Sequence, residues 1–387
     1  MYRFFLSSFF FFVSSFTNAQ RAKLILPIGH TDEINSSQFS PDGKQVLTAS
    51  NDFTAKIWDV ESGNLIADLK GHTFFVNSAR FSPDGKQVVT VGQDGKMILW
   101  DTVTGDSIYS ITPSSWVVSY AEFSPNGKLI VVASDNMAVI WDVKNKQTLH
   151  LLESHQAVIR SARFSTDGKR IVTASEDKTA MVWDVHTGKA LLTLKHSFAL
   201  RDSQFDSSGK IIVSTANYSN IVSIWNATTG TLLSELIHPE TVNNASFNPD
   251  GTRVVTSCWD KYARIWDTKT GKMVNQLEEH TNIVNSAYYN RDGKRIATTD
   301  GNYVVTWNSA SGEIEKSYEI PFDLNRAKES IFSPDGKRIL VTCGNFSVKI
   351  VGLINDTLIS DLSGYTYSIN SARFSPDGSK VVTTCDD

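Results

Sequence analysis

The sequence has little cysteine, no marked excess of one charge and none of the common catalytic motifs. Its three cysteines in 387 residues are too few for a disulfide scaffold and too sparse for a zinc module. With 37 basic and 41 acidic residues, the formal charge of −4 indicates no basic surface for nucleic acid. Phosphate loops of the GxxxxGKS/T type, HExxH and GxSxG do not occur. We therefore expect no cofactor, no metal site and no catalytic residues.

After the first twenty residues the chain also lacks an apolar run long enough to span a membrane. At the start, Arg3 precedes an uncharged, Phe-rich stretch from Phe4 to Phe16, which is followed by small residues up to Ala19. This order is typical of a secretory signal peptide, and 13 residues are too few for a membrane anchor. We expect residues 1–19 to be a signal peptide cleaved after Ala19. The mature protein, residues 20–387, is then secreted or periplasmic and has no membrane span.

What the sequence has in abundance is one turn, of the type Ser-Pro-Asp-Gly, which recurs at intervals of 41 to 43 residues. Its last residue is in turn Gly43, Gly85, Gly127, Gly168, Gly209, Gly251, Gly293, Gly336 and Gly378. Within each unit, apolar runs of about five to seven residues alternate with turn-forming pairs, which predicts four short strands. The sheet of one unit cannot bury both of its faces, so neighbouring units are expected to stack.

These units resemble the WD40 repeat, and the resemblance covers roughly residues 22–387. The family's third strand ends in Trp-Asp, and seven units here have that pair or Trp-Asn at one phase: Trp58-Asp59, Trp100-Asp101, Trp141-Asp142, Trp183-Asp184, Trp225-Asn226, Trp266-Asp267 and Trp307-Asn308. The eighth unit has Val351-Gly352 instead, and the ninth stops before this point. The resemblance implies an all-β fold, a WD40-type β-propeller of four-stranded antiparallel blades, with about nine repeats and the last one incomplete.

The resemblance further implies a hydrogen-bonded network of His, Ser or Thr, Asp and Trp in each well-formed blade. Four units have all its residues: His30, Thr48, Asp52, Trp58; His72, Thr90, Asp94, Trp100; His155, Thr173, Asp177, Trp183; and His238, Thr256, Asp260, Trp266. An indole N–H can only donate, whereas hydroxyl and imidazole groups donate and accept, so such a chain can satisfy its buried members. A buried polar group of the network that lacked a hydrogen-bond partner would destabilise the folded state by about 1–3 kcal/mol.

Other units depart from this pattern. The third has Ser114 in place of His, the fifth lacks the Asp, and the seventh has Asp300 displaced by one position. The eighth unit keeps nothing of the network. We expect these blades to be more loosely held.

The number of strands leaves the closure of the ring open. Residues 23–28 resemble the lone outer strand with which such rings close. Together with eight four-stranded units and half of the ninth, the count is 35 strands, one short of nine blades. Two arrangements are consistent with this count: a ring of seven or eight blades with a second ring begun, or one larger ring left open.

Histidine and cysteine are better explained by packing than by chemistry. Six of the eight histidines fall at one phase of the repeat. One histidine per blade cannot converge on a zinc ion at about 2.1 Å. The hydroxyl of each network is expected to accept the Trp N–H, which leaves no hydrolase triad. The cysteines each follow a turn glycine by seven residues and are expected to be small, free core residues: Cys258, Cys343 and Cys385.

The remaining candidates lie on the surface. In the family, two positions of the first strand and the residue before the network Asp ring the upper face, and here they form a polar rim with aromatic residues. Phe74, Phe75 and Trp116 are the preferred anchors, although they could instead fill gaps around the third unit. Five more residues are candidate partner contacts: Asn77, Arg160, Arg201, Trp259 and Lys328. The recurring Asn of the first strand has a structural alternative, since Asn tolerates a bulged backbone.

We predict an exported, non-enzymatic scaffold or recognition module that binds a protein or peptide partner through the upper face. Nucleic acid is not an expected partner. The alternative is the recognition portion of a larger exported enzyme whose catalytic domain lies beyond Asp387. The fold alone does not identify the partner.

Overall fold

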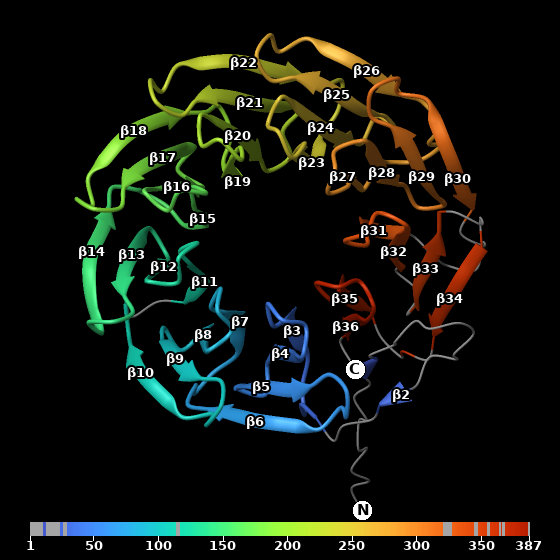
Figure 1. Cartoon of the computed structure of the whole chain (residues 1–387). Coiled ribbons are helices and arrows are strands. Elements are labelled where there is room, and N and C mark those ends of the chain that lie inside the picture. Colours follow the sequence, from blue (N-terminus) through green and yellow to red (C-terminus); the bar gives the residue numbers. More distant parts are fainter. Residues whose placement is uncertain are drawn as a thin grey trace, which may run out of the picture.

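The protein is described by a computed structural model that covers residues 11–12, 24–25, 29–113, 117–319, 327–343, 347–353, 357–363, 365 and 368–385. Its described strands form a ring of antiparallel sheets around a central channel (Figure 1). Eight sheets have four strands in sequence order, with the first strand of each at the channel and the fourth at the rim (Figure 1). We call these sheets blades one to eight. The described part of the chain contains no helix that could cross a membrane.

The strands of the first four blades have the following bounds. Blade one contains β3 (Ile34–Phe39), β4 (Gln45–Ser50), β5 (Thr54–Asp59) and β6 (Leu65–Lys70). Blade two contains β7 (Val76–Phe81), β8 (Gln87–Gly92), β9 (Met97–Asp101) and β10 (Ser107–Ile111). Blade three contains β11 (Val118–Phe123), β12 (Leu129–Ser134), β13 (Met137–Asp142) and β14 (Gln147–Glu153). Blade four contains β15 (Ile159–Phe164), β16 (Arg170–Ser175), β17 (Thr179–Asp184) and β18 (Ala190–Lys195).

The next four blades continue around the ring. Blade five contains β19 (Leu200–Phe205), β20 (Ile211–Ala216), β21 (Ile221–Asn226) and β22 (Leu232–Ile237). Blade six contains β23 (Val242–Phe247), β24 (Arg253–Cys258), β25 (Ala263–Asp267) and β26 (Met273–Leu277). Blade seven contains β27 (Ser286–Tyr289), β28 (Arg295–Thr299), β29 (Tyr303–Asn308) and β30 (Ile314–Glu319). Blade eight contains β31 (Ala327–Phe332), β32 (Arg338–Cys343), β33 (Ser347–Gly352) and β34 (Thr357–Ser363).

A ninth blade occupies the remaining sector of the ring. Its two inner strands are β35 (Ile369–Phe374) and β36 (Val381–Cys385). At the N-terminus, β1 (Phe11–Phe12) pairs with β2 (Leu24–Ile25), and β1 contacts β36. Of the outer strand predicted at residues 23–28, only β2 is described, and it is paired rather than alone. β1 falls within the predicted signal peptide, whose other residues lie outside the described part of the chain.

The ring is closed, which differs from both arrangements that the strand count left open. Blade nine packs on blade one: Val382 joins a buried cluster with Val46 and Trp58, and the Lys380 ammonium lies 2.9 Å from the Glu61 carboxylate. The propeller prediction is thus confirmed as a single ring of nine blades. The count alone could not show this, because ring size depends on the angle between blades rather than on the local strand pattern.

The recurring turn has a simple local cause. Ser40 Oγ lies 2.6 Å from Asp42 Oδ1 and accepts the N–H of Gln45 at 2.9 Å, which folds the chain back between β3 and β4. Gly43 has a φ of 72°, in the left-handed region that favours glycine. A Cβ at Gly43 would lie 3.3 Å from Pro376 of blade nine, so the turns of neighbouring blades also touch.

The predicted polar network is present in blade one. The Nδ1–H of His30 donates to Asp52 Oδ2 at 2.8 Å, and His30 Nε2 lies 2.7 Å from Thr48 Oγ1. The Trp58 indole donates to the same hydroxyl at 3.0 Å. Because the carboxylate can only accept, the imidazole proton sits on Nδ1 and Nε2 accepts from Thr48. Blades two and four repeat these contacts: His72, Thr90, Asp94, Trp100, and His155, Thr173, Asp177, Trp183.

In blade six the predicted network is wrong at Asp260. His238 and Trp266 share the Thr256 hydroxyl as predicted, but His238 Nδ1 donates to the carbonyl of Leu236 at 3.0 Å. Asp260 instead faces the buried Arg264, with Oδ2 2.7 Å from a guanidinium nitrogen. The reason is electrostatic, since a buried guanidinium without a carboxylate would be more costly than an imidazole that has a backbone acceptor.

Among the remaining described blades, blade seven keeps the bond from Trp to Thr, whereas blades five, three and nine depart from it. In blade five the Trp225 indole donates directly to His196 Nε2 at 3.0 Å, and in blade seven Trp307 donates to Thr298 at 2.8 Å. In blade three Trp141 Nε1 is buried without an acceptor among the described residues. In blade nine Tyr365 takes the place of histidine and lies 2.7 Å from Thr383.

Burial of the imidazoles links stability to pH. Desolvation lowers the pKa of His30, His72 and His155, although their Asp partners oppose it. Burial also lowers the pKa of His196 and His238 to about 4. The unfolded chain, with histidine pKa values near the ordinary 6.5, therefore binds more protons than the folded chain below that pH.

We expect the free energy of unfolding to fall as the pH is lowered from 7 to 5, by up to about 1.4 kcal/mol per pH unit for each such histidine. Urea titrations at several pH values measure this slope. His238→Gln should make the slope shallower, whereas replacement of the exposed His186 should not. Stability that stays constant between pH 7 and pH 5 would contradict the buried, neutral state of these side chains.

Candidate binding surface

Three phenylalanines, two of them exposed, form a cluster on the upper face, which is the face that carries the turns between the second and third strands. Phe74 and Phe75 lie in the connection between β6 and β7, and Phe53 lies in the turn between β4 and β5. The ring centroids of Phe74 and Phe75 are 4.6 Å apart, and those of Phe53 and Phe74 are 5.8 Å apart with the rings stacked. Phe53 is 40% exposed and Phe74 is 44% exposed. We call these three residues the phenylalanine cluster.

Phe53 was not among the predicted residues, and Trp116 lies outside the described part of the chain. The repeat could have indicated Phe53, because blade two has a glycine, Gly95, at the equivalent turn position. Both residues have a left-handed φ, of 71° for Phe53 and 75° for Gly95. A bulky residue there is strained by about 1–2 kcal/mol. Asp52 holds the turn by accepting from the N–H of Thr54 at 2.9 Å, so the strained residue presents its ring outward.

The recurring Asn of the first strand links neighbouring blades. Each side-chain Nδ2 donates to a backbone carbonyl of the next blade, at distances of 2.7 to 3.3 Å: Asn35 to Val76, Asn77 to Val118, Asn243 to Val284, Asn285 to Ala327, and Asn370 to Ile34. The last of these bonds crosses the closure of the ring. Asn77, a candidate partner contact, therefore has its amide committed to packing, which favours the structural alternative for this position.

Arg160 and Arg201 occupy the same strand position in blades four and five but have different surroundings. The Arg160 side chain donates from Nε to Glu176 Oε1 at 2.8 Å and forms an ion pair there. Arg201 donates to the carbonyl of Asn243 and has no carboxylate partner among the described residues. Trp259 lies nearby, 40% exposed, and its indole donates to Asn243 Oδ1 at 2.7 Å.

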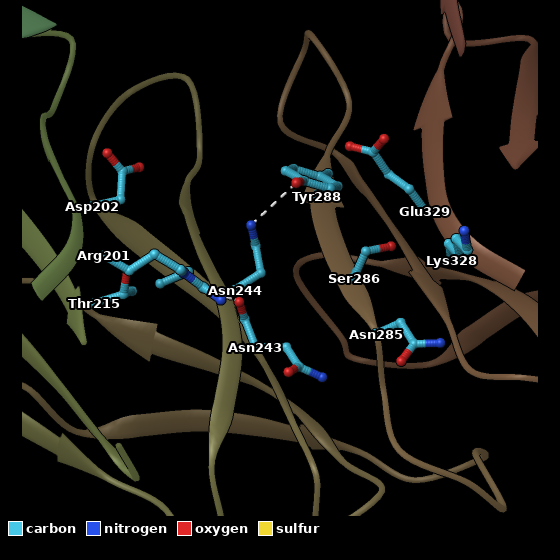
Figure 2. A pocket seen from close by; sticks show the side chains of 11 residues that line it. Arg201, Asp202, Thr215, Asn243, Asn244, Asn285, Ser286, Tyr288, Lys328 and Glu329 are labelled. Atoms are coloured by element: carbon cyan, nitrogen blue, oxygen red, sulfur yellow. Dashed lines mark hydrogen bonds between the residues drawn. The ribbon is translucent and has the colours of Figure 1, made fainter. Parts of the chain in front are cut away.

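A polar cavity of about 310 Å³ lies between the inner strands of blades five to eight (Figure 2). Its lining residues are Arg201, Asp202, Thr215, Asn243, Asn244, Ala245, Asn285, Ser286, Tyr288, Lys328 and Glu329. Arg201 and Lys328, both candidates from the sequence, lie in this lining (Figure 2). Asn244 donates to the Tyr288 hydroxyl at 3.1 Å. Burial, with the charge of Glu329, raises the pKa of Tyr288 to about 12, so this phenol stays neutral.

Apart from Arg160 on blade four, the predicted contacts that are described thus divide into two groups rather than one surface. Phe74 and Phe75 lie at blades one and two, whereas Arg201, Trp259 and Lys328 lie at blades five to eight. In the described residues, no group of three His, Cys, Asp or Glu side chains is placed to hold a metal ion. The three cysteines are buried and form no disulfide with a described residue, and burial raises the pKa of the Cys258 and Cys343 thiols to about 11.

Comparisons with known proteins agree with the repeat structure. The family model described as WD domain, G-beta repeat matches more than half of the chain, in six segments: residues 22–59, 63–101, 105–142, 146–184, 230–267 and 356–387. The chain is also similar in fold to a computationally designed protein, Ika8, whose crystal structure is known. The TM-score is 0.66 with 23% identity, over 84% of this chain and 97% of that one. At that identity the similarity concerns the fold alone.

Similarity to curated proteins is confined to short segments. Over 39 residues the chain is 51% identical to Periodic tryptophan protein 2 of Saccharomyces cerevisiae, which is 10% of this chain and 4% of that protein. Over 42 residues it is 48% identical to WD repeat-containing protein 38 of Mus musculus, which is 11% of this chain and 14% of that protein. The matched part is therefore about the length of one repeat and a small fraction of each relative.

The strained turn at Phe53 gives a measurable expectation. Phe53→Gly and Lys178→Gly both replace a residue at the same left-handed turn position, but only Phe53 contacts other rings. Relief of strain is common to both variants. Phe53→Gly should therefore be less favourable to stability than Lys178→Gly by about 0.5–1.5 kcal/mol, the contribution of an aromatic contact. Urea denaturation measures the difference, and equal effects of the two variants would mean that the phenylalanine cluster is not formed.

Proposed function

The chain belongs to the WD40 repeat family, and from that premise we propose that it is an exported, non-enzymatic recognition module that binds a protein or peptide partner. Members of this family commonly serve as scaffolds for protein interactions. The phenylalanine cluster is the proposed anchor on the upper face. Export rests on the composition of residues 1–19.

The observation that carries the proposal is the exposure of the cluster. Aromatic side chains that contact one another yet remain about two-fifths exposed have apolar area left for a partner to bury. Phe53 keeps its ring in this position in spite of an unfavourable backbone conformation. Binding hot spots in interfaces are enriched in aromatic anchors surrounded by polar residues.

The setting of the cluster supports this role. Asn51 and Glu33 form a hydrogen bond of 3.0 Å beside it, and Asn35 donates to Asn51 at 2.8 Å. These polar groups satisfy one another and provide a rim around the apolar centre. Because the turn and the connection that carry the rings are fixed to strands of two packed blades, a partner would meet a preorganised surface and lose little entropy in ordering it.

We expect the double substitution Phe74→Ala with Phe75→Ala to weaken peptide binding by about thirtyfold, which corresponds to about 2 kcal/mol for hot-spot aromatics. The mature protein would be used to select peptides from a displayed random library, and the dissociation constant of an enriched peptide would be measured by fluorescence anisotropy. The melting temperature should fall by only a few degrees, the loss expected from the ring contacts of the cluster, because Phe74 is exposed and Phe75 is half-buried.

The matched control is Phe198→Ala. Phe198 lies two residues after His196, as Phe74 does after His72, and it is 43% exposed but has no neighbouring aromatic ring at Ala199. This variant should bind the enriched peptide with unchanged affinity. An equal loss in both variants, or a large fall in melting temperature for the Phe74 and Phe75 variant alone, would argue that the cluster serves packing instead.

Export has its own test. When the full chain is produced in a bacterium with a general secretion pathway, the exported protein should begin at Gln20, which intact mass and N-terminal sequencing determine. β1 would then be removed with the leader, while β2 would remain. A chain that stays in the cytoplasm with residues 1–19 attached would contradict the signal-peptide prediction.

A further inference from the structure

The cavity between blades five and eight has an ordered distribution of charge. Arg201 and Asp202 lie at one end, on β19, and Lys328 and Glu329 lie at the other end, on β31 (Figure 2). Between them the inner strands β23 and β27 contribute only uncharged polar and small side chains and one tyrosine to the lining. A ligand in this cavity would therefore meet a charged residue pair at each end and amide groups in the middle.

The two acids of the cavity are already neutralised by arginines outside its lining. Asp202 forms two hydrogen bonds with the Arg163 guanidinium, at 3.0 and 3.2 Å. Glu329 lies 2.9 Å from a guanidinium nitrogen of Arg373. The two cations of the cavity, in contrast to its two acids, have no oppositely charged partner in the part of the chain that the structure describes. Among the described residues neither Arg201 nor Lys328 has a carboxylate oxygen within 4.0 Å, so the cavity has a local excess of positive charge in a chain whose formal charge is −4.

The middle of the cavity offers a hydrogen-bond acceptor. Asn244 donates from Nδ2 to Tyr288, but its Oδ1 is buried with no donor among the described residues. A buried amide oxygen without a donor costs about 1–3 kcal/mol, so a ligand that supplies an N–H is favoured there. The amide of Asn243 is not available in the same way, because its oxygen accepts from Trp259 and its nitrogen donates to Val284.

We propose that this cavity binds a short acidic peptide segment, with a carboxylate side chain at Lys328 or Arg201 and a backbone N–H donated to Asn244 Oδ1. The inference rests on the proposed function and names the chemistry of the partner. A volume of about 310 Å³ admits a few residues of extended chain rather than a folded domain. Carboxylates match the unpaired cations, and the peptide backbone supplies the N–H that a simple anion lacks.

The test compares two labelled peptides of the same length, one with the sequence Gly-Gly-Asp-Gly-Asp-Gly-Gly and one with both Asp replaced by Asn. At low salt the mature protein should bind the acidic peptide at least tenfold more tightly, as measured by fluorescence anisotropy. This preference should decrease as salt is raised from 50 to 300 mM, because the cations are accessible to solvent. Equal binding of the two peptides would overturn the proposal.

The informative variant is Lys328→Met, since Lys328 is exposed and makes no hydrogen bond or ion pair with a described residue. It should reduce the preference for the acidic peptide at least fivefold, and Arg201→Lys should retain most of it because the charge is kept. Arg160→Gln is the matched control, because Arg160 has the same strand position but is paired with Glu176. A Lys328→Met protein that keeps the full preference would overturn the proposal.

The outcome can be separated from that of the proposed function. The Phe74 and Phe75 double variant should bind the short acidic peptide normally, because the phenylalanine cluster lies on other blades. If a library-selected peptide needs the phenylalanine cluster while the acidic peptide and its Asn counterpart bind equally, the proposed function stands and the cavity proposal falls. If the protein prefers the acidic peptide and no library-selected peptide depends on the phenylalanine cluster, the cavity proposal stands and the cluster is not the anchor of the proposed function.

Discussion

The structure depends on the packing of one blade against the next, because no blade can bury its own faces. The second strands are buried along nearly their whole length, so they need neighbours on both sides. The core clusters reflect this: one cluster joins Leu47 and Ile57 of blade one to Val88 and Trp100 of blade two. The same constraint forces the ring to close, and Val382 of blade nine completes the cluster that contains Trp58. The inter-blade amide bonds and the touching turns then fix the register that hydrophobic packing alone would leave free.

Much of this was predictable because the repeat supplied nine copies of the same local evidence. Turn glycines, four-stranded units and the His-Thr-Trp contacts recur at constant spacing, and the structure has them at those residues. What could not be predicted depends on neighbours that are distant in sequence. Asp260 pairs with Arg264 rather than His238, since the energy of that choice lies in the burial of the guanidinium. The closed ring of nine likewise follows from angles between blades, which no local pattern encodes.

The surface shows the same division between repeat and exception. The recurring Asn of the first strand is explained by the repeat, because each side-chain amide donates the same hydrogen bond to the next blade. The phenylalanine cluster and the polar cavity are not, because they arise where individual blades deviate. Phe53 stands where a neighbouring blade has Gly95, and Lys328 and Arg201 stand where other blades have Asn. Three of the four blades around the cavity, blades five, seven and eight, also lie largely in the segments that the family model leaves unmatched, residues 185–229 and 268–355. Both proposed binding sites of this chain therefore lie at positions where the repeat pattern is broken.

Rigid closure has a consequence for how the two surfaces can act together. The phenylalanine cluster belongs to blades one and two and the cavity to blades five to eight, of which blades five and six lie across the channel from the cluster (Figure 1). A ring held by packing at every junction keeps their separation constant, so a partner cannot bring them together by bending the protein. It must itself bridge the channel mouth with an extended segment of suitable length. For a partner that engages both proposed sites, the second contact would be intramolecular and would add to the first. A partner that bears only one of the two features would gain neither that effect nor the selectivity that follows from it, so under the proposed function the distance across the ring would contribute to recognition.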